Sequence, residues 1–525
     1  MPLNPVVDVS LETDLVDGGG AGGLGILKTD YFNEMKRRNF PYDLFFPIYP
    51  QKTRQVIDGA RIRTDTVDVD NSYVKRNPVG ESFEIGGKWY PAKITVYEHP
   101  LSTETTKAYA IEMSPTEKNR WLQKTRLYCE EDEGQQLFLR YAFANGVEKF
   151  LAREKIRPSA YHLNESDTAL LAAKTNGAKV IWNTHTPLGH GHKGFSKHNC
   201  HNLIEDQSYL DFLEAGSVDG YYNWGLALAA KSDKIVCVSD LHGEVTRTKL
   251  YPRYKDKTVS VTNAIDPNWF SPHLQKLFDK HIKGWREEPI LLDNAALPTG
   301  GLMEARELAK ADLAVKFDEW YRNGEVVANF SKLEPGRKIL AYEKRLTFYK
   351  RPQEFLVSSG NFPDAITIIA GKPTDQWGEA FLNGREENGK AVEEGLVREI
   401  LSSKRPMAYI LNLDRTKARY LTAASDVWVN IPRSEDEASG TSWMKPKQGV
   451  LVSTPAGSVP EVIADGRNGL IVADNLSNLN EKIEQALRIA GNKDELDDWN
   501  RRVIASSSHV LTPRMADDFI SGLYN

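Results

Sequence analysis

The sequence predicts an α/β protein built from two doubly wound parallel sheets. Its 525 residues are too many for one ordinary hydrophobic core, so we expect two domains. Short apolar segments of strand length alternate with helical segments in both halves of the chain, which is typical of parallel sheets. The proportions of hydrophobic (40%) and charged (26%) residues are those of a soluble globular protein.

The first half of the chain contains a series of predicted parallel strands. They cover residues 160–163, 179–182, 234–239 and 258–262. Polar loops with the sequences AYHLNES, NTHTP and VTNAIDP fall at the ends of three of them. Ligands of such sheets bind at the carboxyl ends of strands, so these are candidate binding loops. Upstream, residues 38–115 predict strands and hairpins, and residues 137–155 predict an amphipathic helix.

A second series of strands follows a mixed, helical stretch at about 270–335, which we interpret as the connection between the domains. The strands are predicted at 339–342, 366–370, 407–411, 426–430, 449–453 and 470–472, and helices dominate from about 476 onward. We therefore predict an N-terminal domain over 1–330, a C-terminal domain over 331–500 and a terminal helical segment over 501–525.

Composition limits the partners and the compartment. A formal net charge of −5 disfavours nucleic acid as a general partner, so an anionic ligand would need local basic residues. Three scattered cysteines, Cys129, Cys200 and Cys237, predict a reducing, cytoplasmic environment without a disulfide framework. No apolar run is long enough to span a membrane, and the first residues lack the pattern of a signal peptide.

A glycine-rich segment near the start of the chain is the first candidate binding element. Residues 17–30 read DGGGAGGLGILKTD and lead into a helical pattern. A glycine loop that enters a helix lets the backbone approach a phosphate or a sugar closely. A flexible turn explains the same pattern equally well.

The second candidate is Glu437–Lys445, with the sequence EASGTSWMK, after the predicted strand at 426–430. The small residues Ser439, Gly440 and Thr441 can open a helix, whose free N–H groups favour an anion or a sugar hydroxyl. Glu437 would precede that helix and Lys445 would fall about two turns into it. The alternative is a capped helix with Lys445 on its solvated face.

The third candidate is KRLTFYKR, residues 344–351, which has four cations in eight residues just past a strand. Arginine can bind a dianion through two parallel hydrogen bonds and lysine as a point charge, so the segment is a candidate phosphate clamp. A solvated basic turn is the simpler alternative.

These motifs resemble the α-glucan (glycogen, starch or maltodextrin) phosphorylases. EASGTSWMK resembles the segment that carries their pyridoxal 5'-phosphate lysine, and the KR…YKR spacing is identical. GGLG, THTP and TNA resemble their glycine loop, histidine loop and TNG loop, and the similarity is collinear and strongest over 137–270 and 337–463. The resemblance implies the GT-B architecture, with two Rossmann-like domains, the active site in the cleft between them, and a final helix that crosses back onto the first domain.

The resemblance also implies a role for each matching residue. Lys445 would form a Schiff base with the cofactor, whose phosphate would be held by Lys350, Lys344, Thr441 and the amide of Ser442. Substrate phosphate would be held by Arg345 and the amides of Gly22, Gly23 and Gly25. The glucosyl unit would be bound by Glu437, Asn263 and the amides near Ser439 and Gly440. His185 would lie beside the scissile bond, and Asn164 and Glu165 would lie near the donor site.

Five histidines lie close together in the sequence, namely His185, His190, His192, His198 and His201. Imidazole groups suit zinc or copper, so a metal site is conceivable. Neither a Cys-x-x-Cys pair nor an HExxH helix accompanies them, and we predict no metal but a loop bordering the sugar site.

The predicted reaction is retaining phosphorolysis of an α-1,4-glucan to glucose 1-phosphate and a shortened glucan. An oxocarbenium-like transition state is expected, and Lys445 would be an anchor rather than a nucleophile. The resemblance leaves a homodimer open. Departures from the family include Trp443, Ala264, the sequence Pro446-Lys447-Gln448-Gly449, and residues 453–472, which look more like nucleotide-sugar glycosyltransferases. A glycogen-synthase-like enzyme without pyridoxal phosphate, and a catalytically silent GT-B protein that binds glucan or a partner, are therefore the alternatives.

Overall fold

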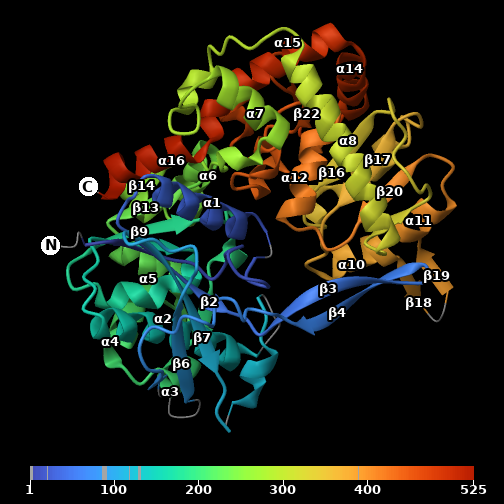
Figure 1. Cartoon of the computed structure of the whole chain (residues 1–525). Helices are drawn as coiled ribbons and strands as arrows, with labels where there is room; N and C mark the ends of the chain where they lie inside the picture. Colours follow the sequence, from blue (N-terminus) through green and yellow to red (C-terminus); the bar gives the residue numbers. More distant parts are fainter. Residues whose placement is uncertain are drawn as a thin grey trace. The chain divides into compact units, whose positions relative to one another are not determined.

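The computed structural model describes residues 4–20, 22–85, 91–117, 119–127, 132–387 and 390–524, so Ala21 of the glycine loop and Cys129 lie outside the described residues. The chain divides into two compact units. Unit 1 comprises Met1–Thr53, Thr66–Asn263 and Met515–Asn525, and unit 2 comprises Arg54–Asp65 and Ala264–Arg514. Each unit holds one large, mainly parallel sheet, as the alternation of strands and helices predicts (Figure 1).

The main sheet of unit 1 has the strand order β14-β13-β9-β8-β1-β2-β7-β6-β5 among the described residues. The strands are β1 (Val6–Val9), β2 (Tyr42–Ile48), β5 (Phe83–Ile85), β6 (Ala92–Glu98), β7 (Thr106–Ser114), β8 (Ala160–Asn164), β9 (Lys179–Thr184), β13 (Lys234–Cys237) and β14 (Thr258–Ser260). The strands from β14 to β7 pair in parallel, and β6 and β5 continue the sheet in the antiparallel sense. The predicted strands after residue 160 are confirmed, whereas β1 is a four-residue central strand that the pattern did not reveal.

Helices surround this sheet and complete its core. They are α1 (Gly23–Arg37), α2 (Glu133–Arg153), α3 (Lys197–Leu203), α4 (Gln207–Leu213), α5 (Trp224–Lys231) and α6 (Asp240–Val245). The predicted helix at 137–155 is α2, and the Asp132 side chain caps it by accepting a hydrogen bond from Gln135 N at 3.0 Å. Its buried Phe138 and Phe150 belong to the same apolar cluster as Phe45 of β2.

The main sheet of unit 2 has the order β15-β20-β17-β16-β21-β22-β23 in the described part of the chain. The strands are β15 (Val326–Ala328), β16 (Ile339–Glu343), β17 (Ile366–Ala370), β20 (Met407–Ile410), β21 (Val427–Asn430), β22 (Val450–Ser453) and β23 (Leu470–Ile471). All of them except the antiparallel edge strand β15 match predicted strands. Their helices include α7 (Pro272–His281), α8 (Gly301–Arg322), α9 (Pro352–Ser359), α10 (Gln376–Asn383), α11 (Leu396–Ser402), α12 (Arg415–Ala424), α14 (Leu479–Gly491) and α15 (Lys493–Ala505).

The division between the units falls earlier than the boundary predicted at residue 330. Residues 264–330 belong to unit 2 because α8 is tied to its sheet by buried charges. Arg306 of α8 donates to Asp426 Oδ1 at 2.8 Å, and Lys310 forms a second ion pair with the same carboxylate at 2.8 Å. Asp426 immediately precedes β21, so removing its carboxylate would leave the buried Arg306 without an ionic partner.

Two other segments belong to units that their sequence positions do not suggest. The hairpin of β3 (Gln51–Asp58) and β4 (Arg61–Asp68) has its tip in unit 2, where Gln55 N donates to Asn412 Oδ1 at 2.7 Å. The chain returns to unit 1 within α16 (Thr512–Phe519), so only residues from 515 onward, rather than the whole of 501–525, join the first unit. None of the helices in the described part is both long and apolar enough to cross a membrane.

Candidate functional site

The basic segment predicted to bind phosphate follows β16 in unit 2. Lys344 and Arg345 come directly after this strand, and Lys350 ends the short 3-10 helix Phe348–Lys350. Gly371 packs against the segment so closely that a Cβ there would lie 1.7 Å from the Lys344 carbonyl oxygen. Because β16 pairs with β21, the loop that follows β21 reaches the same edge of the sheet.

That loop contains Glu437 and Lys445, and it meets the basic segment. Glu437 forms a buried ion pair with Lys350. Lys344 Nζ donates a hydrogen bond to Ser442 Oγ at 2.8 Å. The structure therefore brings together two motifs that the sequence offers as separate candidates.

Lys445 lies beside a carboxylate and an aromatic ring that the sequence motifs did not single out. Its Nζ is 3.3 Å from Glu343 Oε1 and 4.6 Å from the centre of the Trp269 ring, and its side chain is buried. Glu343 is the last residue of β16, and Trp269 ends the 3-10 helix Pro267–Trp269. The only sequence signal for them was their position next to the KR and TNA motifs.

The charges of this cluster are set by burial and by mutual contact. Burial lowers the pKa of Lys344 to about 7, and the neighbouring Lys350 adds to the effect. Burial disfavours the charged form of Lys350 as well, but the Glu437 carboxylate outweighs it and raises the Lys350 pKa. For Glu437, burial would raise the pKa, and the two lysines reverse this and lower it. An anion beside Lys344 would restore its charge, so the cluster is suited to a phosphate group.

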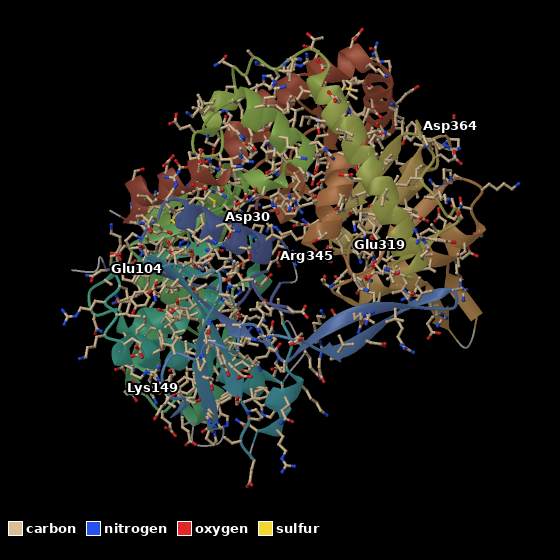
Figure 2. All side chains as sticks on the ribbon, in the orientation of Figure 1. Asp30, Glu104, Lys149, Glu319, Arg345 and Asp364 are labelled. Atoms are coloured by element: carbon tan, nitrogen blue, oxygen red, sulfur yellow. The ribbon has the colours of Figure 1, made fainter. Side chains whose placement is uncertain are left out.

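Arg345, labelled in Figure 2, differs from Lys344 and Lys350. Its side chain is exposed, whereas theirs are buried. Its Nη2 lies 3.5 Å from the Tyr349 hydroxyl. The segment therefore offers two kinds of cation: buried ammonium groups at Lys344 and Lys350, and a guanidinium that a ligand from solvent can reach.

The expectation of a helix with Lys445 two turns inside it is wrong. The chain forms only one 3-10 turn, Ser442–Met444, and Lys445 ends it. Pro446 lacks the N–H that would bond to the Ser442 carbonyl in a continuing α-helix. Gly440, with φ +70°, instead turns the loop back, and a Cβ there would lie 3.3 Å from the Glu437 carboxyl carbon.

The other predicted residues of this loop mainly hold its shape. Ser439 Oγ lies 2.9 Å from Ser458 Oγ, and the Ser439 carbonyl accepts hydrogen bonds from Ser458 N and Trp443 Nε1, both at 3.2 Å. Thr441 is buried in the same loop. The role that the resemblance assigns to the amides of Ser439 and Gly440 stays a prediction.

In unit 1, the predicted glycine loop does enter a helix. Gly22 caps α1, which begins at Gly23. The loop folds tightly on Asp14, whose amide donates to the Gly25 carbonyl at 3.2 Å, and a Cβ at Gly25 would lie 3.0 Å from Asp14 Oδ1. A glycine loop at a helix start can bind a phosphate, and the binding role of Gly22, Gly23 and Gly25 stays a prediction.

His185 and Asn164 lie in contact at the ends of neighbouring strands. His185 Nε2 is 3.1 Å from Asn164 Oδ1. Burial, followed by the charges of Lys28 and His162, holds the pKa of His185 well below its usual value, so the imidazole is neutral. Asn263 is also buried, and its backbone N–H donates to the Val238 carbonyl at 3.2 Å.

Glu165, which directly follows Asn164 at the end of β8, has an unusual backbone conformation and an unusual pKa. Its φ is +58°, a conformation that is strained for a residue other than glycine. Its carboxyl accepts a hydrogen bond from the Thr186 hydroxyl at 2.8 Å, and burial raises its pKa to about 8. Glu165 is therefore largely protonated at neutral pH.

The neighbouring histidines have different surroundings. The His192 ring packs edge-on against Trp182 and Tyr251, and His201 Nε2 lies 3.0 Å from the Tyr222 hydroxyl. Across the described ranges, no three His, Cys, Asp or Glu side chains are grouped as a metal site would require.

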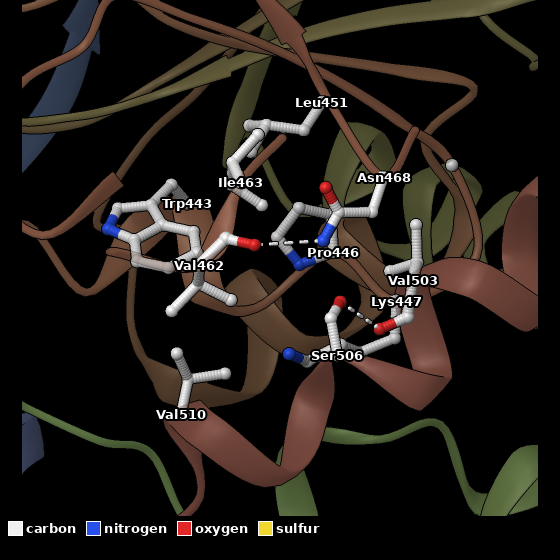
Figure 3. A pocket seen from close by; sticks show the side chains of 11 residues that line it. Trp443, Pro446, Lys447, Leu451, Val462, Ile463, Asn468, Val503, Ser506 and Val510 are labelled. Atoms are coloured by element: carbon white, nitrogen blue, oxygen red, sulfur yellow. Dashed lines mark hydrogen bonds between the residues drawn. The ribbon is translucent and has the colours of Figure 1, made fainter. Parts of the chain in front are cut away.

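A cavity of about 20 Å³ lies within unit 2 beside Lys447. Figure 3 shows the Lys447 side chain among the mainly apolar side chains that line it, including Trp443, Val462, Val503 and Val510. Burial lowers the pKa of Lys447 to about 7. Among the described residues no carboxylate forms an ion pair with this amine, which lies 5.9 Å from the centre of the Phe270 ring.

We expect Lys447→Met to stabilise the protein below pH 7. The unfolded chain keeps the lysine proton up to about pH 10, whereas the folded chain loses it near pH 7, so wild-type stability rises with pH across this window. Methionine removes the cost of burying a charge, so its gain should be largest below pH 7 and fade toward pH 10. Thermal unfolding at pH 6.5 and 9 measures this. Lys417→Met is the matched control: it removes a buried amine that donates to the Leu411 carbonyl at 3.0 Å, and should destabilise.

The sequence is similar to those of known phosphorylases. It is 27% identical to the maltodextrin phosphorylase of Thermococcus litoralis over 347 residues, which cover 60% of this chain and 41% of that protein. It is 25% identical to the glycogen phosphorylase of Aquifex aeolicus over 498 residues, which cover 81% of this chain and 69% of that protein. The chain thus spans less than half the length of the first of these relatives. No protein-family model matches it.

The fold is similar to that of a solved glycosyltransferase. The catalytic domain of Starch Synthase IV from Arabidopsis thaliana, bound to ADP and acarbose, superposes with a TM-score of 0.73 at 14% identity. The match covers 99% of this chain and 98% of that domain. With two sheets of the doubly wound type and a likeness to a solved domain over its whole length, the chain has the GT-B glycosyltransferase fold, and its sequence is similar to those of known α-glucan phosphorylases.

Proposed function

We propose that this protein is a retaining, pyridoxal 5'-phosphate-dependent α-glucan phosphorylase. Its substrates would be an α-1,4-glucan and inorganic phosphate, and its products glucose 1-phosphate and a shortened glucan. The observation that supports this most directly is the cluster in unit 2, in which Lys445 shares a buried site with Lys344 and Lys350. A cytoplasmic location is part of the same proposal.

The residues of this cluster fit the proposed cofactor. Lys344, Lys350 and Lys445 are three buried amines that face two carboxylates, Glu343 and Glu437. The site thus holds one amine more than it has carboxylates, and a phosphate group would favour the charged form of that amine. Lys445 would supply the amine that holds the aldehyde, and Lys344, Lys350, Thr441 and Ser442 would hold the phosphate. When bound, the cofactor supplies a phosphate group that exchanges a proton with the substrate phosphate.

Different residues of the chain would then bind the two substrates. Arg345, as the exposed guanidinium, would bind substrate phosphate and hold it against the anomeric carbon. Glu437, kept ionised by Lys350 and Lys344, would accept hydrogen bonds from the glucosyl hydroxyls. In unit 1, neutral His185 and Asn263 would bind sugar hydroxyls, and the amides of the Gly22–Gly25 loop would bind phosphate.

A nucleotide-sugar glycosyltransferase is the second candidate. It is favoured by the likeness of the whole chain to a starch synthase domain, which was solved with ADP. In that case Arg345 and Lys350 would bind a diphosphate, and no aldehyde would be held by Lys445.

The test compares the two chemistries on the purified protein. We expect an absorbance band in the near ultraviolet and, after borohydride reduction, a pyridoxyl adduct on the peptide that contains Lys445. Glucose 1-phosphate should form from maltodextrin and phosphate. If neither band nor adduct appears after pyridoxal phosphate is added, and glucosyl transfer occurs from ADP-glucose or UDP-glucose, the proposal is wrong and the second candidate is correct.

A further inference from the structure

A buried polar network in unit 1 determines how His185 can hydrogen-bond. Asn164 Nδ2 donates to Asp8 Oδ1 at 2.7 Å and to the Val9 carbonyl at 3.0 Å. Both partners are acceptors, because Val9 offers a carbonyl and Asp8 is held as a carboxylate by Lys28, whose Nζ lies 2.6 Å from Asp8 Oδ2. The Asn164 side-chain amide cannot be flipped, because its oxygen would then face the Asp8 carboxylate and the Val9 carbonyl oxygen.

Asp8 itself is held firmly. Besides Lys28, its carboxylate accepts a hydrogen bond from the Tyr42 hydroxyl and lies 3.3 Å from His162 Nδ1. Burial would raise the pKa of Asp8, but Lys28 and His162 reverse this and lower it. Asp8 is thus an ionised, fully buried carboxylate with three partners besides Asn164, so it fixes the orientation of the Asn164 side-chain amide.

The orientation of Asn164 determines the tautomer of His185. Because Asn164 Nδ2 faces Asp8 and Val9, its Oδ1 faces His185 Nε2 at 3.1 Å, and an amide oxygen only accepts hydrogen bonds. Nε2 therefore carries the ring proton. Since the imidazole is neutral, Nδ1 carries a lone pair, and the one hydrogen bond of this ring among the described residues is made by Nε2.

We propose that Asp8 and Asn164 are positioning residues that hold His185 with Nε2 protonated, so that Nδ1 accepts a hydrogen bond from a sugar hydroxyl. This inference rests on the proposed function and adds to it which of the two substrates His185 binds. A lone pair on Nδ1 pairs with a hydroxyl donor and repels a phosphate oxygen, so His185 acts on the glucan and not on phosphate. Asn164, whose amide nitrogen is fully engaged, acts through His185 rather than on the substrate.

The experiment reads the tautomer directly. In protein labelled with ¹⁵N-histidine, two-dimensional NMR distinguishes a protonated from an unprotonated ring nitrogen, and the resonance absent from His185→Gln identifies the residue. We expect a protonated Nε2 and an unprotonated Nδ1 in the wild type. Maltodextrin should shift the Nδ1 resonance and inorganic phosphate alone should not.

Asn164→Ala and Asn183→Ala make a matched pair of variants. Asn183 is the register partner of Asn164 in the neighbouring strand β9 and is similarly buried, but its side chain does not hydrogen-bond to His185. We expect Asn164→Ala to populate the other tautomer and to lower kcat/KM for glucan about tenfold with KM for phosphate unchanged. Asn183→Ala should keep the wild-type tautomer.

Each result has a definite meaning. A wild-type His185 protonated on Nδ1, or equal spectra for the two asparagine variants, would overturn the inference even in a fully active phosphorylase. Conversely, the expected tautomer in a protein that forms no glucose 1-phosphate would support the positioning network while the proposed reaction fails.

Discussion

Arg345→Ala should lower phosphorolysis by a factor of about 10²–10³, the usual cost of removing one group that stabilises transition-state charge. The exposed guanidinium of Arg345 is the cation of the basic segment that a substrate phosphate can reach, whereas Lys344 and Lys350 are buried against Ser442 and Glu437. Removing it should leave the buried cluster, and with it the cofactor, in place. Initial rates with maltodextrin and phosphate, together with the near-ultraviolet band, measure both effects on one sample.

Arg345→Lys separates charge from geometry. Lysine keeps a positive charge but loses the fork that binds two oxygens of one phosphate, so we expect an intermediate rate and a raised KM for phosphate. Full activity in Arg345→Ala would remove Arg345 from the site. Loss of the absorbance band in the same variant would mean that Arg345 belongs with the cofactor phosphate instead.

The sequence was sufficient to predict most of the sheets, because each buried parallel strand is a short apolar run that can be recognised locally. It also placed the two motifs of unit 2 at the carboxyl ends of β16 and β21, where they meet. The predictions of domain boundaries were wrong because they depend on contacts between residues far apart in the sequence. The boundary near 330 failed because Arg306 is tied to Asp426, 120 residues away, and the tip of the β3–β4 hairpin is fixed by Asn412.

Within the site, the sequence identified the residues but not their partners. Glu343 and Trp269 flank Lys445 only because β16 and the Pro267–Trp269 turn converge in space. The predicted helix after Glu437 failed for a local reason that was visible in the sequence, since Pro446 stops it after one turn. The network from Asp8 through Asn164 to His185 could not be predicted, because β1 was not recognised as the strand beside β8.

Lys445→Arg should abolish cofactor binding and reduce phosphorolysis to background. A primary amine condenses with an aldehyde and a guanidinium does not, whereas the arginine keeps the positive charge that faces Glu343 and the Trp269 ring. We therefore expect a folded protein without the near-ultraviolet band and without a borohydride-stable adduct.

Lys447→Met provides the comparison, because this lysine is two residues away but lines a separate, mainly apolar cavity. It should keep both the band and the adduct. If the adduct persists in Lys445→Arg and disappears in Lys447→Met, the amine that anchors the cofactor is that of Lys447, whose pKa burial lowers to about 7. Wild-type rates of glucosyl transfer from a nucleotide sugar in Lys445→Arg would instead show that the lysine only balances Glu343, as a synthase-like enzyme would require.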